Sequence, residues 1–95
     1  MIILNVTHSV DKEVAEDWIS WMKDKHIPEA LRKGLFTDCK VLKVLSHEDD
    51  RTFSYAVQFH SNSLENIEKY MEIDDEIQKR YGDRVLTYPT LLEEI

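Results

Sequence analysis

The residue best suited to chemistry in this sequence is His26, which lies two residues before Pro28. The first predicted helix carries an apolar arc, and His26 continues this arc in line with Ile19 and Met22. An imidazole facing a cavity there could accept a proton from a bound ligand as a general base. It could equally hydrogen-bond a carbonyl group at the helix end and complement the helix dipole. Both interpretations stay open.

Two tryptophans, Trp18 and Trp21, lie about one turn apart on the same predicted helix, next to Met22. Together with His26 they could line an apolar ligand pocket between the helix and a sheet. Paired tryptophans in a small domain also serve as core and interface anchors. The single Cys39 has no base beside it in the sequence, so we expect it to be a small buried hydrophobe.

Metal and cofactor chemistry are not predicted. No two of the four histidines share ligand spacing along a helix or strand, and one cysteine cannot form a cysteine cage. One arrangement stays conceivable, in which His26, His60 and Glu29 meet at one end of the domain. The sequence has no Gly-rich phosphate loop, nucleophile elbow or paired-carboxylate signature, so we expect no metal and no cofactor.

The charge excludes several classes of partner. The chain has 12 Lys and Arg against 19 Asp and Glu, a net charge of −7, and all of this excess falls in residues 48–95. Without a basic cluster, such a chain is repelled by nucleic acid and by anionic membrane surfaces. The longest uncharged stretch is 13 residues, too short for a membrane-spanning helix. The free cysteine and the lack of an export signal favour the cytoplasm.

These candidate residues must be positioned by the secondary structure of one small domain over residues 1–95. Asp11 is expected to cap the first helix, and Pro28 to interrupt it before a short second helix over 28–33. Ser63 is expected to cap a further helix that kinks or restarts at Asp74 or Asp75. Hydrophobic and β-branched patterns predict strands over residues 2–7, 36–46, 52–60 and 84–90, with a hairpin loop over 47–51 and a last segment, 91–95, that extends the fourth strand or forms a tail.

The order β-α-β-β-α-β favours a ferredoxin-like α+β sandwich, with a four-stranded antiparallel sheet of order 4-1-3-2 and both helices on one face. Alternation along the strands divides the side chains into two rows. The predicted inner row, under the helices, is Ile2, Leu4, Val6, Phe53, Tyr55, Val57 and Phe59. The predicted outer row is Ile3, Asn5, Thr7, Ser54, Ala56, Gln58 and His60.

The outer row contains no charged residue, which is unusual for a sheet face in water. We therefore expect a second copy of the chain to cover it and form a homodimer. Leu91 and Leu92 point to opposite faces of a strand, so a one-sided sheet can bury only one of them. We expect the partner to bury the other.

Several short motifs resemble a known family. They are the run from Trp18 to Lys23 followed by His26-Ile27-Pro28, the Gly34-Leu35-Phe36-Thr37 turn, Tyr81-Gly82-Asp83, and the closing Thr90-Leu91-Leu92-Glu93. Together they resemble a bacterial family of small proteins with a domain of unknown function, which is similar in turn to the dimeric α/β-barrel superfamily. The resemblance implies a ferredoxin-like fold and a homodimer.

That superfamily includes cofactor-independent monooxygenases, haem-degrading monooxygenases, lactone isomerases and non-enzymatic binders. The resemblance therefore predicts the fold of this chain better than it predicts an activity. Asn5 resembles the strand asparagine of its haem-degrading and antibiotic monooxygenases, and it joins Trp18, Trp21, Met22 and His60 as a candidate ligand-binding residue. Two functions follow. The first is a homodimeric ligand-binding or structural module. The alternative is a cofactor-independent monooxygenase or isomerase that acts on a small apolar or aromatic compound, with His26 as acid and base.

Overall fold

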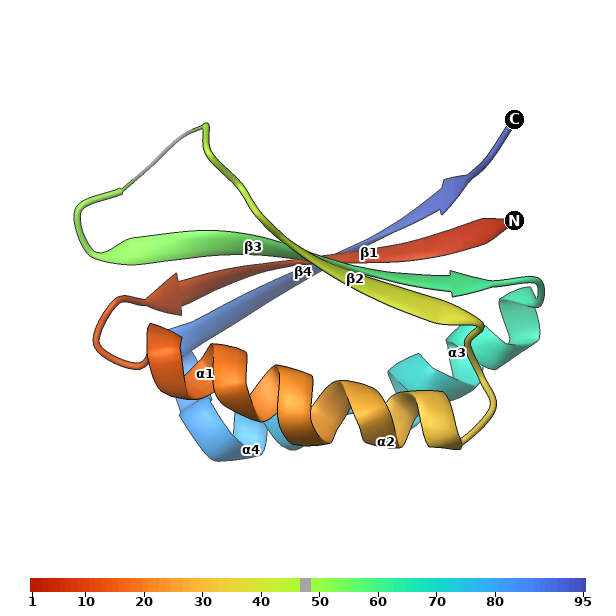
Figure 1. Cartoon of the computed structure of the whole chain (residues 1–95), viewed down its shortest axis with the longest axis horizontal. Helices are drawn as coiled ribbons and strands as arrows, with labels where there is room; N and C mark the ends of the chain where they lie inside the picture. Colours follow the sequence, from red (N-terminus) through yellow and green to blue (C-terminus); the bar gives the residue numbers. More distant parts are fainter. Residues whose placement is uncertain (47–48) are drawn as a thin grey trace.

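The computed structural model describes residues 1–46 and 49–95, and it shows an antiparallel sheet whose helices all lie on one face (Figure 1). The strands are β1 (Ile2–Asp11), β2 (Asp38–Lys43), β3 (Thr52–Ser61) and β4 (Val85–Glu93). The helical elements are α1 (Ala15–Trp21), the π-helical segment η1 (Met22–His26), α2 (Ile27–Arg32), α3 (Leu64–Ile73), α4 (Glu76–Tyr81) and the 3-10 turn η2 (Gly82–Arg84).

The sheet has four strands in the order β2-β3-β1-β4, which confirms the predicted ferredoxin-like fold. The two longest strands, β1 and β3, lie in the centre and pair antiparallel from Ile2 opposite Ser61 to Asp11 opposite Thr52. β4 pairs only with β1 and therefore forms one edge of the sheet. It continues through Glu93, so the segment after residue 90 extends the strand.

The core lies between the sheet and the helices, where the inner row was predicted. Leu4, Val6, Tyr55, Val57 and Phe59 are buried there, and Ile2 and Phe53 are half-buried. The helices contribute a matching set of buried side chains, namely Ala15, Trp18, Met22, Ile27, Ala30, Ile67, Tyr70, Ile77 and Tyr81. The sheet thus buries one face against the helices within the chain, as alternation along the strands requires.

The first helix begins later than predicted. Asp11 is the last residue of β1 and pairs with Thr52, so its backbone belongs to the sheet. Its carboxylate accepts a hydrogen bond from the backbone N–H of Glu13 at 2.8 Å, which closes the turn after the strand. The predicted helix cap at Asp11 is therefore wrong, because the sheet ladder extends four residues beyond the predicted end at Thr7.

Pro28 does not interrupt the helix, contrary to prediction. α1, η1 and α2 form one continuous helical rod in Figure 1. A proline lacks an N–H group, and its ring collides with the carbonyl group four residues earlier in a regular α-helix. The π-helical turn over Met22–His26 widens the backbone here, and the N–H group of Ile27 bonds to the carbonyl oxygen of Met22, five residues back. Pro28 then occupies the first turn of α2, where a missing N–H group costs little.

The second helical region follows the prediction closely. The Ser63 hydroxyl accepts a hydrogen bond from the backbone N–H of Asn66 at 3.2 Å and caps α3. Asp74 has an extended backbone that breaks the helix, and α4 restarts after Asp75. Gly82, with φ of 58°, ends α4. The break turns the Asp74 side chain toward the core rather than along the helix surface.

β2 is shorter than the predicted strand over 36–46. Phe36 lies before the strand and packs its ring 4.6 Å from that of Phe59 and 5.1 Å from that of Tyr70. Core packing of this aromatic side chain therefore outweighs its strand propensity. Of the predicted hairpin loop over 47–51, His47 and Glu48 lie outside the described residues.

Candidate functional site

His26 is buried, with 4% of its surface exposed, and it stands at the centre of a polar cluster under the sheet. Its Nε2 atom lies 2.8 Å from the hydroxyl oxygen of Tyr70, a residue of α3. The same nitrogen lies 3.6 Å from Oδ1 of Asp74, at the break between α3 and α4. The π-helical turn and the helix break thus bring a histidine, a tyrosine and an aspartate together from segments 44 or more residues apart.

The charge on Asp74 is stabilised by this cluster. Burial raises the pKa of its carboxyl group, but the polar contacts with His26 and Tyr70 and the charge interactions with His26 and His8 more than offset it and bring the pKa below its usual value. Burial and the neighbouring Asp74 carboxylate raise the pKa of Tyr70 far above its usual value. Asp74 is therefore an acceptor at neutral pH, and Tyr70 keeps its proton and can donate it in a hydrogen bond.

The other side of the His26 ring faces the surface. Its Nδ1 atom lies 3.7 Å from Oε2 of Glu76, which is half exposed. The ring also stacks on Trp21, with centroids 5.0 Å apart. Arg80 lies over the same indole ring at 5.3 Å. Carboxylates therefore face both ring nitrogens of His26, and an aromatic side chain fixes the ring plane.

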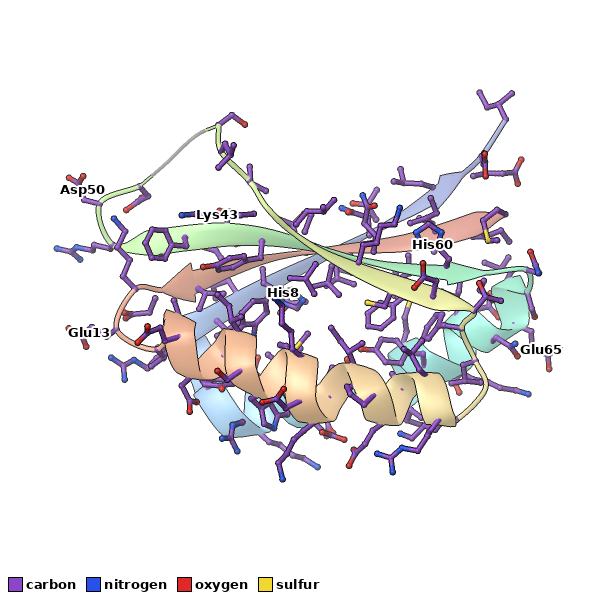
Figure 2. All side chains as sticks on the ribbon, in the orientation of Figure 1. His8, Glu13, Lys43, Asp50, His60 and Glu65 are labelled. Atoms are coloured by element: carbon purple, nitrogen blue, oxygen red, sulfur yellow. The ribbon has the colours of Figure 1, made fainter. Side chains whose placement is uncertain are left out.

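A second buried histidine, His8, approaches the cluster from β1. Figure 2 shows its side chain on the helix side of the sheet. It is 1% exposed, its Nδ1 atom lies 3.1 Å from Oγ1 of Thr87, and its ring packs 5.1 Å from Trp18. Burial lowers the pKa of His8 to about 4, while Asp74 raises it and His26 lowers it by smaller amounts. His8 is therefore neutral at pH 7.

A pocket of about 120 Å³ opens between α3 and β4 beside this cluster. Leu4 and Val6 form its floor on the sheet, and Tyr70 and Asp74 belong to its helix side. The same Tyr70 and Asp74 also border a much smaller cavity of about 10 Å³ next to His26. The polar cluster thus connects with an apolar pocket through two shared side chains.

The other predicted ligand residues have different positions. Trp18 and Met22 are fully buried in the core, with Trp18 between His8 and Tyr55, and they line neither cavity. The Trp21 ring contacts that of His26, but Trp21 lines neither cavity. Asn5 and His60 alternate with buried residues and lie on the outer face of the sheet, away from the helices and His26. Figure 2 labels His60 on this face. The structure therefore brings together only Trp21 and His26 from the predicted set, with Met22 in the adjoining core.

The conceivable metal arrangement of His26, His60 and Glu29 is not formed. His60 alternates with the buried Phe59 and points away from the helices, so the sheet separates it from His26. Over residues 1–46 and 49–95, no group of three or more histidine, cysteine, aspartate or glutamate side chains is arranged to hold a metal ion. In the same part of the chain, no helix is long and apolar enough to cross a membrane.

Three residues of the cluster were not predicted as site residues. His8 continues the inner row two residues beyond Val6, so a longer predicted β1 would have identified it. Tyr70 lies in the apolar stripe of α3, and its hydroxyl group gave no separate signal. Asp74 is an acidic residue within that stripe, and an acidic residue at a buried helix position is the pattern that indicates a polar site.

The fold, with its pocket between helices and sheet, places the chain in the class of ferredoxin-like α+β domains, and two solved structures share this fold. One is a Deinococcus radiodurans protein provisionally described as an antibiotic biosynthesis monooxygenase, with a TM-score of 0.61 and 19% identity over 99% of this chain and 92% of the other. The second is a Bacillus halodurans protein of the ethyl tert-butyl ether D family, with a TM-score of 0.63 and 14% identity over 100% of both chains. At these identities the similarity establishes the fold alone.

The family is established over the whole length. Residues 1–95 match the family described as a domain of unknown function, DUF4286, and the chain belongs to that family. This confirms the resemblance that the sequence motifs predicted. No match is found among curated proteins.

Proposed function

We propose that the chain, as a single domain over residues 1–95, is a homodimeric module that binds a small apolar molecule in the pocket between α3 and β4. The observation that carries this proposal is the pocket itself, which joins an apolar lining to the buried cluster of His26, Tyr70 and Asp74. An apolar cavity with a few converging polar groups is the usual form of a ligand site.

The size of the pocket restricts the ligand. An apolar cavity of about 150 Å³ accommodates a benzene molecule. The pocket here, at about 120 Å³, is open to solvent on one side and fits a single ring or a short branched chain. Larger ligands would extend past Met71 and Pro89 at its border.

The test is an NMR titration of isotope-labelled protein with ring-sized compounds. Binding in the pocket shifts the resonances of Leu4, Val6 and Met71 first. In Val6→Phe the added ring occupies the pocket, so the shifts of Leu4 and Met71 disappear. The matched control is Ser20→Phe, which places the same ring on the exposed side of α1, away from the pocket and the outer face, and keeps the shifts. Binding that survives in Val6→Phe and moves resonances elsewhere contradicts the proposal.

The homodimer is supported by the outer face of the sheet. Its central row is uncharged, and the outward positions of β2 and β4 add four exposed apolar side chains, Leu42, Leu86, Tyr88 and Leu92. The Nε2 atom of His60 is buried on this face without a hydrogen-bond partner among the described residues. Charges on this face lie at its margins, at Asp38 and Lys40 on the edge strand β2 and at Asp11, the last residue of β1. A partner over β1, β3 and β4 would cover this surface.

Of the two tail leucines, Leu92 fits the same proposal. The expectation that the chain itself buries one of the pair is wrong, because Leu91 on the edge strand β4 stays half exposed. Leu91 faces the helix side opposite Leu4, and Leu92 faces outward opposite Ile3. They are 49% and 43% exposed within the single chain. A partner that covers the outer face would bury Leu92.

Sedimentation equilibrium tests the dimer. A homodimer is expected at micromolar concentration, and Ala56→Lys, which puts a charge in the centre of the outer face, should shift it to monomer. Ser20→Lys, on the exposed side of α1, is the control and should leave the dimer intact. A monomeric wild-type chain would remove this part of the proposal.

The alternative function, a cofactor-independent oxygenase or isomerase, is favoured by one observation, the 2.8 Å contact between His26 and Tyr70 beside the pocket. A buried base next to a protonated hydroxyl group can take a proton from carbon while the hydroxyl stabilises the enolate oxygen. Hydrogen–deuterium exchange at the carbon next to the carbonyl group of cyclohexanone, measured in D₂O, tests this alternative. The C–H bond breaks, the base takes the proton, and solvent returns a deuteron to form C–D. On this alternative His26→Gln abolishes the exchange without unfolding the chain.

The proposed location is the cytoplasm. Burial, with a further contribution from Asp38, raises the pKa of the Cys39 thiol to about 12. Cys39 is half-buried on the helix side of β2, where it acts as a small hydrophobe. The sequence has this one cysteine and therefore no disulfide within the chain, which fits a reducing compartment.

A further inference from the structure

The pocket between α3 and β4 has an asymmetric charge. Among the seven described residues that line it, only Asp74 carries a charge, and the others are apolar or uncharged. Asp74 reaches the pocket because the backbone at the end of α3 is extended, with φ of −92° and ψ of 91°. A carboxylate at the wall of an apolar pocket is costly to desolvate unless a partner of opposite charge or a strong donor meets it.

The partners of Asp74 within the chain leave part of this carboxylate free. The contact with Nε2 of His26 is 3.6 Å, which is longer than a hydrogen bond. Tyr70 supplies a single hydroxyl proton, and its oxygen is already 2.8 Å from the same Nε2 atom. A carboxylate has about four acceptor positions, so at least two stay available to a ligand.

The surrounding charges do not neutralise the site. His26 lies between Asp74 and Glu76, so even a fully protonated imidazole balances only one of these two carboxylates. His8 is neutral because burial lowers its pKa to about 4. Lys33 and Glu29, which border the small cavity beside His26, offset each other. The cluster therefore carries a net negative charge toward the pocket.

We propose that the pocket takes a small organic cation, in which a primary ammonium group bonds to Asp74 and a ring or short alkyl body packs on Leu4, Val6 and Pro89. This proposal rests on the proposed function and names the class of ligand. An ammonium group supplies up to three donors to the free acceptor positions of Asp74. A carboxylate of the same shape would meet repulsion, and a neutral alcohol would leave the charge of Asp74 without a counter-charge.

The experiment uses three compounds with one cyclohexane body, namely cyclohexylamine, cyclohexanol and cyclohexanecarboxylate. Each is titrated into the full-length labelled protein at pH 7, and binding is read from the resonances of Leu4, Val6 and Met71. We expect the amine to bind about tenfold more tightly than the alcohol, and the carboxylate not to bind. Asp74→Asn removes the charge and should bring the amine to the level of the alcohol or below it.

Asp75→Asn is the matched control. It makes the same change one residue further along, at an exposed carboxylate paired with Lys79, and should keep the preference for the amine. It also tests for diffuse attraction of amines to this acidic chain. If Asp74→Asn does not fold, the ranking of the three compounds on the wild-type protein still decides.

The outcomes separate the two proposals. If none of the three compounds shifts the pocket resonances, the proposed ligand site fails, and the inference fails with it. If amine and alcohol bind equally and Asp74→Asn changes neither, the pocket is a ligand site but the assignment of a cationic ligand is wrong. An amine preference that Asp75→Asn abolishes as completely as Asp74→Asn also overturns the inference, since it would then reflect surface charge.

Discussion

The two faces of the sheet differ in what covers their side chains. On the helix side, His8 bonds to Thr87 and His26 to Tyr70, while the buried Nε1 atom of Trp18 has no hydrogen-bond partner among the described residues. On the outer face, Asn5 and Gln58 bond only to each other and to Thr7, and the buried nitrogen of His60 has no partner among the described residues. Each face thus leaves one buried ring nitrogen without a partner, and the contrast lies in covering: helices lie over the inner face, and no element of the described chain lies over the outer face (Figure 1).

The difference between the faces indicates where a ligand and where a second copy of the chain would bind. The inner face is largely covered by the chain itself, because its helices bury the inner side chains of β1 and β3, while Leu91 on the edge strand β4 stays exposed. The outer face carries exposed apolar side chains such as Leu86 and Tyr88, and these have no covering element within the described chain. Ligand chemistry is therefore expected on the inner face and association on the outer face.

The largest expected contrast is in packing. Trp18 is completely buried on the inner side, while Leu86 is 48% exposed on the outer side. Trp18→Ala should lower the free energy of unfolding by about 3–5 kcal/mol, because it removes a large side chain and leaves a cavity. Leu86→Ala should cost under about 1 kcal/mol within the chain. Urea denaturation of both variants at one protein concentration measures the contrast, and equal losses would contradict it.

The second contrast is in pH dependence. The pKa of His8 is about 4 in the folded chain against 6.5 for the free side chain, so between these values the unfolded chain binds a proton that the native chain does not. Stability should therefore fall by about 3 kcal/mol as the pH is lowered from 6.5 to 4. The low pKa of Asp74 adds a further loss in acid, as the pH falls through its folded value.

Thermal or urea unfolding across this pH range tests the assignment. In His8→Asn the side chain no longer titrates, so the slope between pH 6.5 and 4 should decrease, although the variant is less stable at pH 7. A slope that is unchanged in His8→Asn would assign the acid sensitivity to other groups.

The third contrast compares two tyrosines. Tyr70→Phe removes the hydroxyl group that faces His26 and should cost about 1–3 kcal/mol, since a buried polar atom loses its partner. Tyr88 lies on the outer face and is 56% exposed, so Tyr88→Phe should change the free energy of unfolding by less than about 0.5 kcal/mol. The Tyr70 variant should also lower the affinity for a pocket ligand, which calorimetry measures. Equal effects at the two positions would remove the distinction between the faces.

The smallest expected effect is at Asn5. Its amide oxygen accepts a hydrogen bond from Gln58 at 3.2 Å on the outer face. Because this bond is partly exposed to water, Asn5→Ala should change the free energy of unfolding by only about 0.5 kcal/mol. Its effect on ligand binding in the pocket should be nil, and a loss of binding would restore Asn5 as a ligand residue.

The fold could be predicted from the sequence because each strand has its own local signal. Alternation in β1 and β3 identifies the buried row, and Ser63, Gly34 and Gly82 mark helix ends by their capping and positive-φ conformations. The start of α1 and the continuity of the helix through Pro28 could not be predicted. Both depend on non-local contacts, namely the pairing of Asp11 with Thr52 and the packing that favours a π-helical turn.

The site was predicted in part. His26 was identified because it continues an apolar arc, but its partners Tyr70 and Asp74 come from a helix 44 or more residues away. Nothing in the local sequence says which residues of that helix face His26. Asn5 was joined to the site by the family resemblance and His60 by its place at the same end of the domain as His26, and strand alternation places both across the sheet.

The π-helical segment Met22–His26 contains one residue more than an α-helical turn. A descendant chain that lost one residue here would keep α1 and α2 in phase as a regular helix, and the core would survive. If the lost residue were His26, the last of the segment, Tyr70 and Asp74 would lose their partner while the helix stayed regular. Among homologous chains, the length of this one turn should therefore distinguish those that retain the polar cluster from those that inherit only the fold.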